Sequence, residues 1–168
     1  ILERSGLKIG VFGLTTTSLK HLGTRETMSH VDVRPLAEVA REQVAALEPQ
    51  VDLVVALTHT GLDADRAVAA EVDGIDLIVG GHSHTALQEA VRVSGTWIVQ
   101  AGSYGRQLGV LRLQVDDGEL TSFSSELRDL VLEDLPGPAS PDVRALVSQL
   151  EAGVAERFER VIGELPAD

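Results

Sequence analysis

Apolar positions in the first hundred residues follow two different periods. Short apolar runs rich in β-branched residues predict buried strands at residues 7–14, 51–57, 75–79 and 96–101. Apolar residues at helical spacing predict a helix over 35–47 and a shorter helix over 63–72. Strands that alternate with helices are typical of βαβ units. The pattern therefore favours an α/β fold with a largely parallel sheet.

The pattern changes after residue 106. Two further strands, 107–115 and 119–127, flank the turn sequence DDG, which predicts a hairpin. Prolines at positions 136, 138 and 141 then interrupt the periodicity, and residues 143–165 regain a helical pattern. We therefore expect a C-terminal hairpin and a long terminal helix. The expected boundary divides the chain into 1–135 and 136–168, and the helix is either an ordinary terminal helix or a strut toward a further domain.

Composition narrows the classes of function. The chain has 168 residues, enough for one domain with its own core. It has no cysteine, which excludes disulfides, thiolate metal ligands and a cysteine nucleophile. No apolar run reaches the length of about 20 residues that a membrane span needs. The net charge of −12 argues against a nucleic acid duplex as partner, because phosphate backbones are bound by clustered Lys and Arg.

Three of the five histidines follow predicted strands. His59 follows the strand 51–57, and His82 and His84 follow the strand 75–79 with one residue between them. Ligands of open α/β sheets bind beyond the carboxyl ends of the strands, and imidazole is the commonest metal ligand of proteins. We therefore expect these three side chains to meet at one edge of the sheet and to bind metal.

Other polar residues are given structural roles. His21 and His30 lie in a polar stretch and are expected to be solvated loop residues. Asp63 and Asp65 are expected to begin the short helix, where acidic side chains complement the helix dipole. Asp76 stands near the start of its strand and is also expected to be structural.

Arg106 is a candidate for substrate contact. It closes the segment QAGSYGR (100–106), which follows the fourth predicted strand. The planar guanidinium group binds phosphate well, so Arg106 could contact a phosphate group, and the alternative is a side chain that faces solvent.

Four segments together carry a resemblance to a known family. They are LKIGVFGLTT (7–16), LTHTG (57–61), GGHSHT (80–85) and VQAGSYG (99–105). With these segments in this order, the sequence resembles the 5′-nucleotidase family of calcineurin-like metallophosphoesterases, which includes UDP-sugar hydrolases and cyclic-nucleotide phosphodiesterases. The resemblance implies that residues 1–135 form the second half of the αββα catalytic sandwich. It also implies that the terminal helix leads toward a separate substrate-binding domain.

The resemblance implies a site with two divalent metal ions, which could be Mn, Zn, Fe, Mg or Ca. His59 and His82 match ligands of one ion, and His84 matches a ligand of the other. A metal-activated water would hydrolyse the phosphate ester of a nucleotide or nucleotide sugar, and the protein would be periplasmic, secreted or on the cell surface. The family's Asp-x-His, Gly-Asp and Gly-Asn-His motifs, which supply the other ligands, are absent from these 168 residues. We therefore expect no further catalytic residue in this chain, and no activity from the chain alone.

Two alternatives remain open at the level of the sequence. Thiosulfohydrolases of sulfur oxidation share the scaffold, although they tend to have Thr and Asp where Ser83 and Thr85 stand here. The second alternative is a degenerate, metal-free half-domain that serves as a binding or structural module.

Overall fold

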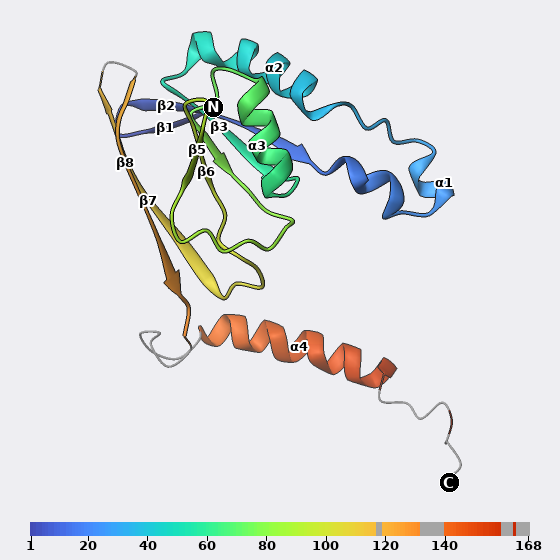
Figure 1. Cartoon of the computed structure of the whole chain (residues 1–168). Coiled ribbons are helices and arrows are strands. Elements are labelled where there is room, and N and C mark those ends of the chain that lie inside the picture. The colour runs from blue at the N-terminus through green and yellow to red at the C-terminus, as the bar shows by residue number, and fades with distance from the viewer. Residues whose placement is uncertain (117–118, 132–139, 159–162, 164–168) are drawn as a thin grey trace. The chain divides into compact units, whose positions relative to one another are not determined.

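The structure is a computed structural model that describes residues 1–116, 119–131, 140–158 and 163 (Figure 1). The chain divides into two compact units, Ile1–Leu130 and Val131–Asp168, and each is described by itself.

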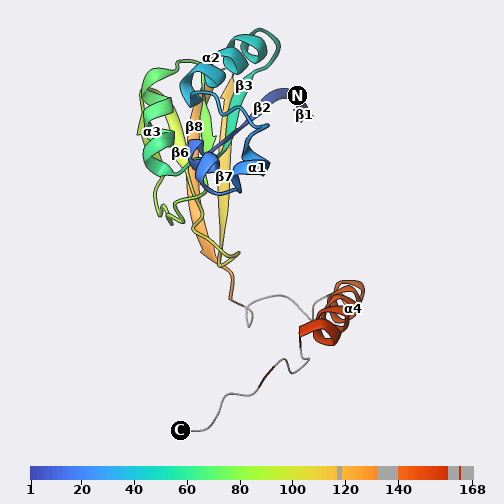
Figure 2. The same ribbon diagram turned by 90° about the vertical axis from the view of Figure 1, so that its right-hand side faces the viewer.

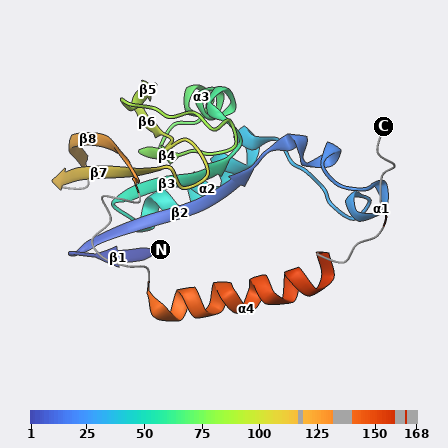
Figure 3. The same cartoon turned by 90° about the horizontal axis from the view of Figure 1, so that it is seen from below.

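A six-stranded sheet forms the centre of the first unit. Its strands lie in the order β1-β2-β3-β4-β6-β5. The four central strands β2, β3, β4 and β6 are parallel, and β1 and β5 pair antiparallel at the two edges. Figure 3 shows β2 and β3 running side by side. The largely parallel sheet predicted from the sequence is therefore confirmed. The strand bounds are β1 Leu2–Arg4, β2 Leu7–Thr15, β3 Leu53–His59, β4 Leu77–Val79, β5 Val91–Val93 and β6 Thr96–Val99.

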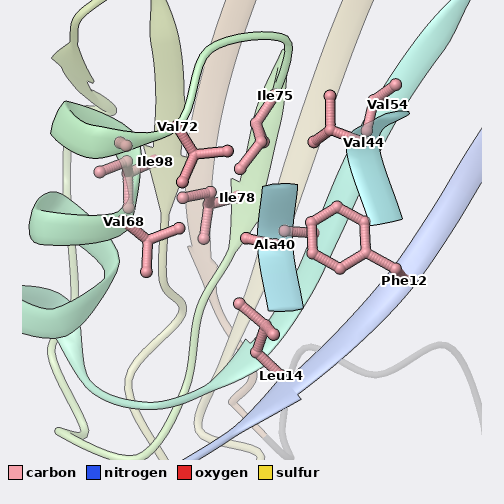
Figure 4. Close-up of a cluster of buried hydrophobic side chains, with 12 residues drawn as sticks. Phe12, Leu14, Ala40, Val44, Val54, Val68, Val72, Ile75, Ile78 and Ile98 are labelled. Carbon is pink, nitrogen blue, oxygen red and sulfur yellow. The ribbon is translucent and has the colours of Figure 1, made fainter. Parts of the chain in front are cut away.

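Two helices, α2 (Leu36–Leu47) and α3 (Leu62–Glu71), cover one face of this sheet (Figures 1 and 2). The remaining helical segments are short: η1 (Thr17–His21), α1 (Arg25–Met28) and η2 (Glu48–Gln50). The core between the sheet and the two helices is aliphatic apart from one phenylalanine (Figure 4). It comprises Phe12, Leu14, Ala40, Val44, Val54, Ala56, Val68, Ala69, Val72, Ile75, Ile78 and Ile98.

The opposite face of the sheet is covered only in part. Successive residues of a strand point to opposite faces, and in β2 every second side chain is buried on the helix side. On the other side Val11 is 40% exposed and Leu57 is 56% exposed. Near-continuous apolar strands normally have cover on both faces, so this part of the sheet departs from the usual arrangement.

A hairpin packs against the far side of the sheet, away from α2 and α3. It consists of β7 (Gln107–Asp116) and β8 (Glu119–Asp129), as the sequence predicts, although Asp117 and Gly118 of its turn lie outside the described residues. The ring of Trp97 in β6 stacks on that of Phe123 in β8, with centroids 4.2 Å apart and planes 5° from parallel. The guanidinium carbon of Arg92 lies 5.0 Å from the centroid of the Trp97 ring. Aromatic stacking therefore contributes to the attachment of the hairpin.

The second unit contains α4 (Pro141–Phe158). The backbone N–H of Arg144 donates to the carbonyl of Ser140, which begins the helix. The predicted helix is thus confirmed as far as residue 158, while its expected continuation to residue 165 and the prolines at 136 and 138 fall outside the described residues, apart from position 163. Among the helices of the described ranges, none is both long enough and apolar enough to cross a bilayer.

The half-buried carboxylate of Asp76 gives the first unit a dependence on pH. Its Oδ2 accepts the backbone N–H of Val54 at 2.8 Å. Burial raises the pKa of Asp76 above its ordinary 3.8, the hydrogen bond from Val54 opposes the shift, and the charge of Glu48 adds to it. The folded protein therefore holds this proton more strongly than the unfolded chain. The resulting stabilisation is complete below pH 3.8 and is lost as the pH rises through the raised pKa.

Asp76→Asn is expected to remove this loss of stability with rising pH, because an amide oxygen can still accept the N–H of Val54 and the amide carries no charge. The free energy of unfolding of the variant should therefore rise relative to that of the original chain between pH 4 and pH 7. Urea unfolding at four or five pH values measures the difference. Asp73→Asn, at an exposed position, controls for the loss of one negative charge. A difference that is the same at every pH would contradict the assignment.

Candidate metal centre

Two histidine-bearing segments, the end of β3 and the loop after β4, meet at the same edge of the sheet. Strand β3 ends at His59, and the parallel strand β4 ends at Val79, which pairs in register with Leu57. The loop after β4 then brings His82 against His59. The two imidazole rings lie edge to face, with centroids 5.1 Å apart and an angle of 69° between their planes.

Glycine permits this close approach. A Cβ atom at Gly81 would lie 3.1 Å from Nδ1 of His59 and 3.3 Å from the carbonyl oxygen of Thr58, tighter than ordinary contacts. The loop backbone is also unusual, because His82 has φ 78° and His84 has φ 57°. Non-glycine residues adopt this left-handed region at a cost of about 1–3 kcal/mol, and such residues cluster where the surrounding structure holds a binding or catalytic site.

His84 has a different neighbour. Its ring lies edge to face with that of Tyr104, at 5.2 Å between centroids, in the loop that follows β6. Tyr104 is 82% exposed, and the guanidinium carbon of Arg106 lies 5.9 Å from the centroid of its ring. His84, Tyr104 and Arg106 therefore form a second group beside the His59–His82 pair.

The donor chemistry of the pair fits a divalent metal ion. An ion bound at about 2.0–2.1 Å by one nitrogen of each ring lies roughly 3 Å from each centroid, so two rings can share an ion when their centroids are at most about 6 Å apart. The observed separation of 5.1 Å satisfies this condition. The described residues hold no group of three or more His, Cys, Asp or Glu side chains that could together coordinate a metal. The metal ligands inferred from the sequence therefore stay a prediction.

Asp65 has a role that the sequence did not reveal. It lies in α3 with a side chain only 1% exposed, and its Oδ1 accepts hydrogen bonds from the hydroxyls of Thr58, at 2.7 Å, and Thr60. These two threonines flank His59. Burial raises the pKa of Asp65, and the two hydroxyl bonds oppose the shift. The interpretation of Asp65 as an acidic residue that only complements the helix dipole was therefore incomplete, because its partners lie at and just after the end of β3.

Gln100, like Asp65, is a buried polar residue, and its hydrogen bonds go to the loop after β4. Its side chain is 3% exposed, and its Oε1 accepts from the hydroxyl of Ser83 at 3.0 Å and from the backbone N–H of Thr85. Its Nε2 donates to the carbonyl of Gly81 at 3.1 Å. The side chain thus spans the segment that contains His82 and His84.

The two remaining histidines lie elsewhere in the structure. His21 ends the short helix η1, His30 follows α1, and both are exposed.

Comparison with known sequences finds relatives that are much longer than this chain. No family model matches the chain. It is 34% identical, over 80% of its length, to the trifunctional nucleotide phosphoesterase protein YfkN of Bacillus subtilis, of which it covers 9%. It is 32% identical, over 76% of its length, to a 5′-nucleotidase of Vibrio vulnificus, of which it covers 29%. The chain therefore spans less than a third of the length of these two curated relatives.

Solved structures show the same fold. A 5′-nucleotidase precursor from Thermus thermophilus superposes with a TM-score of 0.73 at 28% identity, over 95% of this chain and 34% of that one. The sulfate thiohydrolase SoxB of the same organism superposes with a TM-score of 0.77 over 92% of this chain and 28% of that one, but at 24% identity it indicates the fold alone. Over most of its length, the chain is a relative of the 5′-nucleotidase family of metallophosphoesterases, and it matches part of the length of those proteins.

Proposed function

We propose that this chain is part of a metal-dependent hydrolase that cleaves nucleotide phosphate esters in the manner of a 5′-nucleotidase. In this proposal His59 and His82 hold one divalent metal ion and His84 holds a second. The observation that carries the proposal is the edge-to-face pair of His59 and His82 at the carboxyl edge of a parallel sheet, in a chain related to 5′-nucleotidases.

Two bound divalent ions would activate a water molecule and stabilise the charge on the phosphoryl oxygens. The chain's own residues present the imidazole nitrogens from two neighbouring strand ends, and Gly81 lets the His59 ring lie against the adjacent loop. The histidines serve in this proposal as ligands and not as proton acceptors.

Arg106 is proposed to contact the phosphate group of the substrate. It is exposed and lies next to Tyr104, whose ring contacts His84. A chain with a net charge of −12 repels a nucleotide at long range, so a cation beside the site would help to offset this repulsion. The carboxylate and asparagine motifs that the resemblance implies are absent from these 168 residues, so we expect the chain by itself to bind metal weakly and to be inactive.

Titration of the purified chain with Mn²⁺ tests the metal site directly. The paramagnetic ion should broaden the imidazole NMR signals of His59, His82 and His84 first, while the signals of His21 and His30 should persist at the same concentrations. Equal broadening of all five histidines, or none, would contradict the proposal and favour the metal-free binding module. The hydrolytic step is tested by phosphate release from a nucleoside monophosphate, in a longer protein that contains this chain together with the missing motifs.

A further inference from the structure

Two buried polar side chains lie under the two histidine loops. Asp65 and Gln100 are almost completely buried, and neither side chain is a candidate metal ligand. Buried polar groups are costly unless they are hydrogen-bonded. Oδ1 of Asp65 accepts from the hydroxyls of Thr58 and Thr60, on either side of His59, while its Oδ2 is buried with no hydrogen-bond partner among the described residues. The hydrogen bonds of Gln100 go to the loop that carries His82 and His84.

We infer that Asp65 and Gln100 are positioning residues that together fix the His59 loop and the His82–His84 loop in a geometry ready for metal. We call the two side chains the loop lock. The inference rests on the proposed function, because it assumes that the histidines bind metal. It gives Asp65, and Gln100 of the segment VQAGSYG (99–105), a role toward the histidines that the sequence patterns and the comparisons do not assign.

Asp65 determines the direction of His59. Alternate residues along an extended chain point to opposite sides, and Thr58 and Thr60 both point toward Asp65 on the helix side of the sheet. The residue between them must then project on the opposite side. The two hydroxyl bonds to one carboxylate oxygen therefore hold the His59 ring on the face where it meets His82.

Gln100 stabilises an unfavourable backbone conformation in the loop after β4. Its three hydrogen bonds contact Gly81, Ser83 and Thr85, which alternate with the two histidines in left-handed conformation. Such conformations persist only where neighbouring contacts enforce them. The amide of Gln100 provides contacts of this kind on both sides of His82 and of His84.

The side chains of Asp65 and Gln100 both lie against Gly80. A Cβ atom at this position would lie 2.5 Å from Oδ2 of Asp65 and 3.2 Å from Nε2 of Gln100. Two further bonds join the loops themselves: the N–H of Gly61 donates to the carbonyl of Gly81 at 3.1 Å, and the N–H of Leu62 donates to the hydroxyl of Ser83 at 3.1 Å. The lock therefore acts on the relative position of the loops as well as on each loop.

The test compares Mn²⁺ affinity with stability in matched variants of the chain. Gln100→Met and Asp65→Ala remove the lock bonds, and each should weaken Mn²⁺ binding by about 10- to 100-fold, the range found when outer partners of metal ligands are removed. Asp65→Asn keeps an oxygen that can accept from the two threonines, so it should restore the affinity to within about threefold of that of the original chain. Affinity is measured by titrating the imidazole NMR signals, and stability by urea unfolding.

Thr96→Val is the matched control. Thr96 is also buried, and its hydroxyl donates to the carbonyl of Ile75 at 2.8 Å, at the opposite end of β6 from Gln100. The control should lower the free energy of unfolding and leave the Mn²⁺ affinity unchanged. If the control weakens Mn²⁺ binding as much as Gln100→Met, the lock is only a general contribution to stability and the inference is wrong.

Two other outcomes separate the inference from the proposed function. If the original chain binds Mn²⁺ at its histidines and a folded Gln100→Met variant binds it equally well, the positioning role of Gln100 is wrong, and the proposed metal site is supported. If the original chain binds no Mn²⁺, the proposed function fails and the lock fails with it. Ser83→Ala, at an exposed position, removes the hydrogen bonds of the Ser83 hydroxyl with Gln100, Leu62 and Thr85. It should weaken Mn²⁺ binding about two- to fivefold, and it keeps the test valid should the stronger variants not fold.

Discussion

Replacing His82 by alanine is expected to lower phosphate release from a nucleoside monophosphate by about 10³-fold or more, in a longer protein that contains this chain and the missing ligands. The variant loses one imidazole of the His59–His82 pair, whose ring centroids lie 5.1 Å apart. Metal ions supply several kcal/mol of transition-state stabilisation in such hydrolases, and about 1.4 kcal/mol corresponds to a factor of ten in rate. The rate is measured with Mn²⁺ or Zn²⁺ added, together with the metal content by mass spectrometry.

His21→Ala is the control for this substitution. His21 is exposed at the end of η1, so its loss should leave the rate near that of the original protein. Equal losses at both positions would indicate general destabilisation. If His82→Ala retains two metal ions per chain and normal turnover, His82 is not a ligand and the proposed metal centre is wrong.

Gly80→Ala is expected to cause the largest loss of stability among single small substitutions near the site. The added methyl group would lie 2.5 Å from Oδ2 of Asp65 and 3.4 Å from the carbonyl oxygen of Val99, so buried groups must move. Overpacking of this kind costs about 1–3 kcal/mol. Gly13→Ala is a suitable control, because the nearest atom to the added carbon there is 3.9 Å away. Urea unfolding measures both variants, and equal stabilities would mean that Asp65 is not held against Gly80.

Long periodic segments were predicted well from the sequence, and short edge segments were not. The segments that became β2, α2, β7 and β8 are 9, 12, 10 and 11 residues long, so each carries its apolar pattern over many positions. The edge strands β1 and β5 were missed, because each has only three residues, with charged residues among them. Their pairing with β2 and β6 is decided by the neighbouring strand, which a local pattern cannot show.

The candidate site also has features that the sequence predicts and features that it does not. Parallel strands have their carboxyl ends at one edge of a sheet, so the meeting of His59 and His82 could be anticipated from strand order alone. The contact of His84 with Tyr104 could not, because it depends on the path of a loop 20 residues further along the chain. Asp65 lies in the first turn of α3 as expected, but its burial could not be predicted, since it results from packing and not from its local sequence.

The stacked pair of Trp97 and Phe123 gives this chain a built-in optical reporter. Trp97 is its only tryptophan, so the fluorescence emission of the chain comes largely from one point between the sheet and the hairpin. Detachment of the hairpin would bring water to the indole and shift the emission to longer wavelength, even where the helices and the six-stranded sheet stay folded. Label-free fluorescence can therefore follow the attachment of β7 and β8 separately from global unfolding.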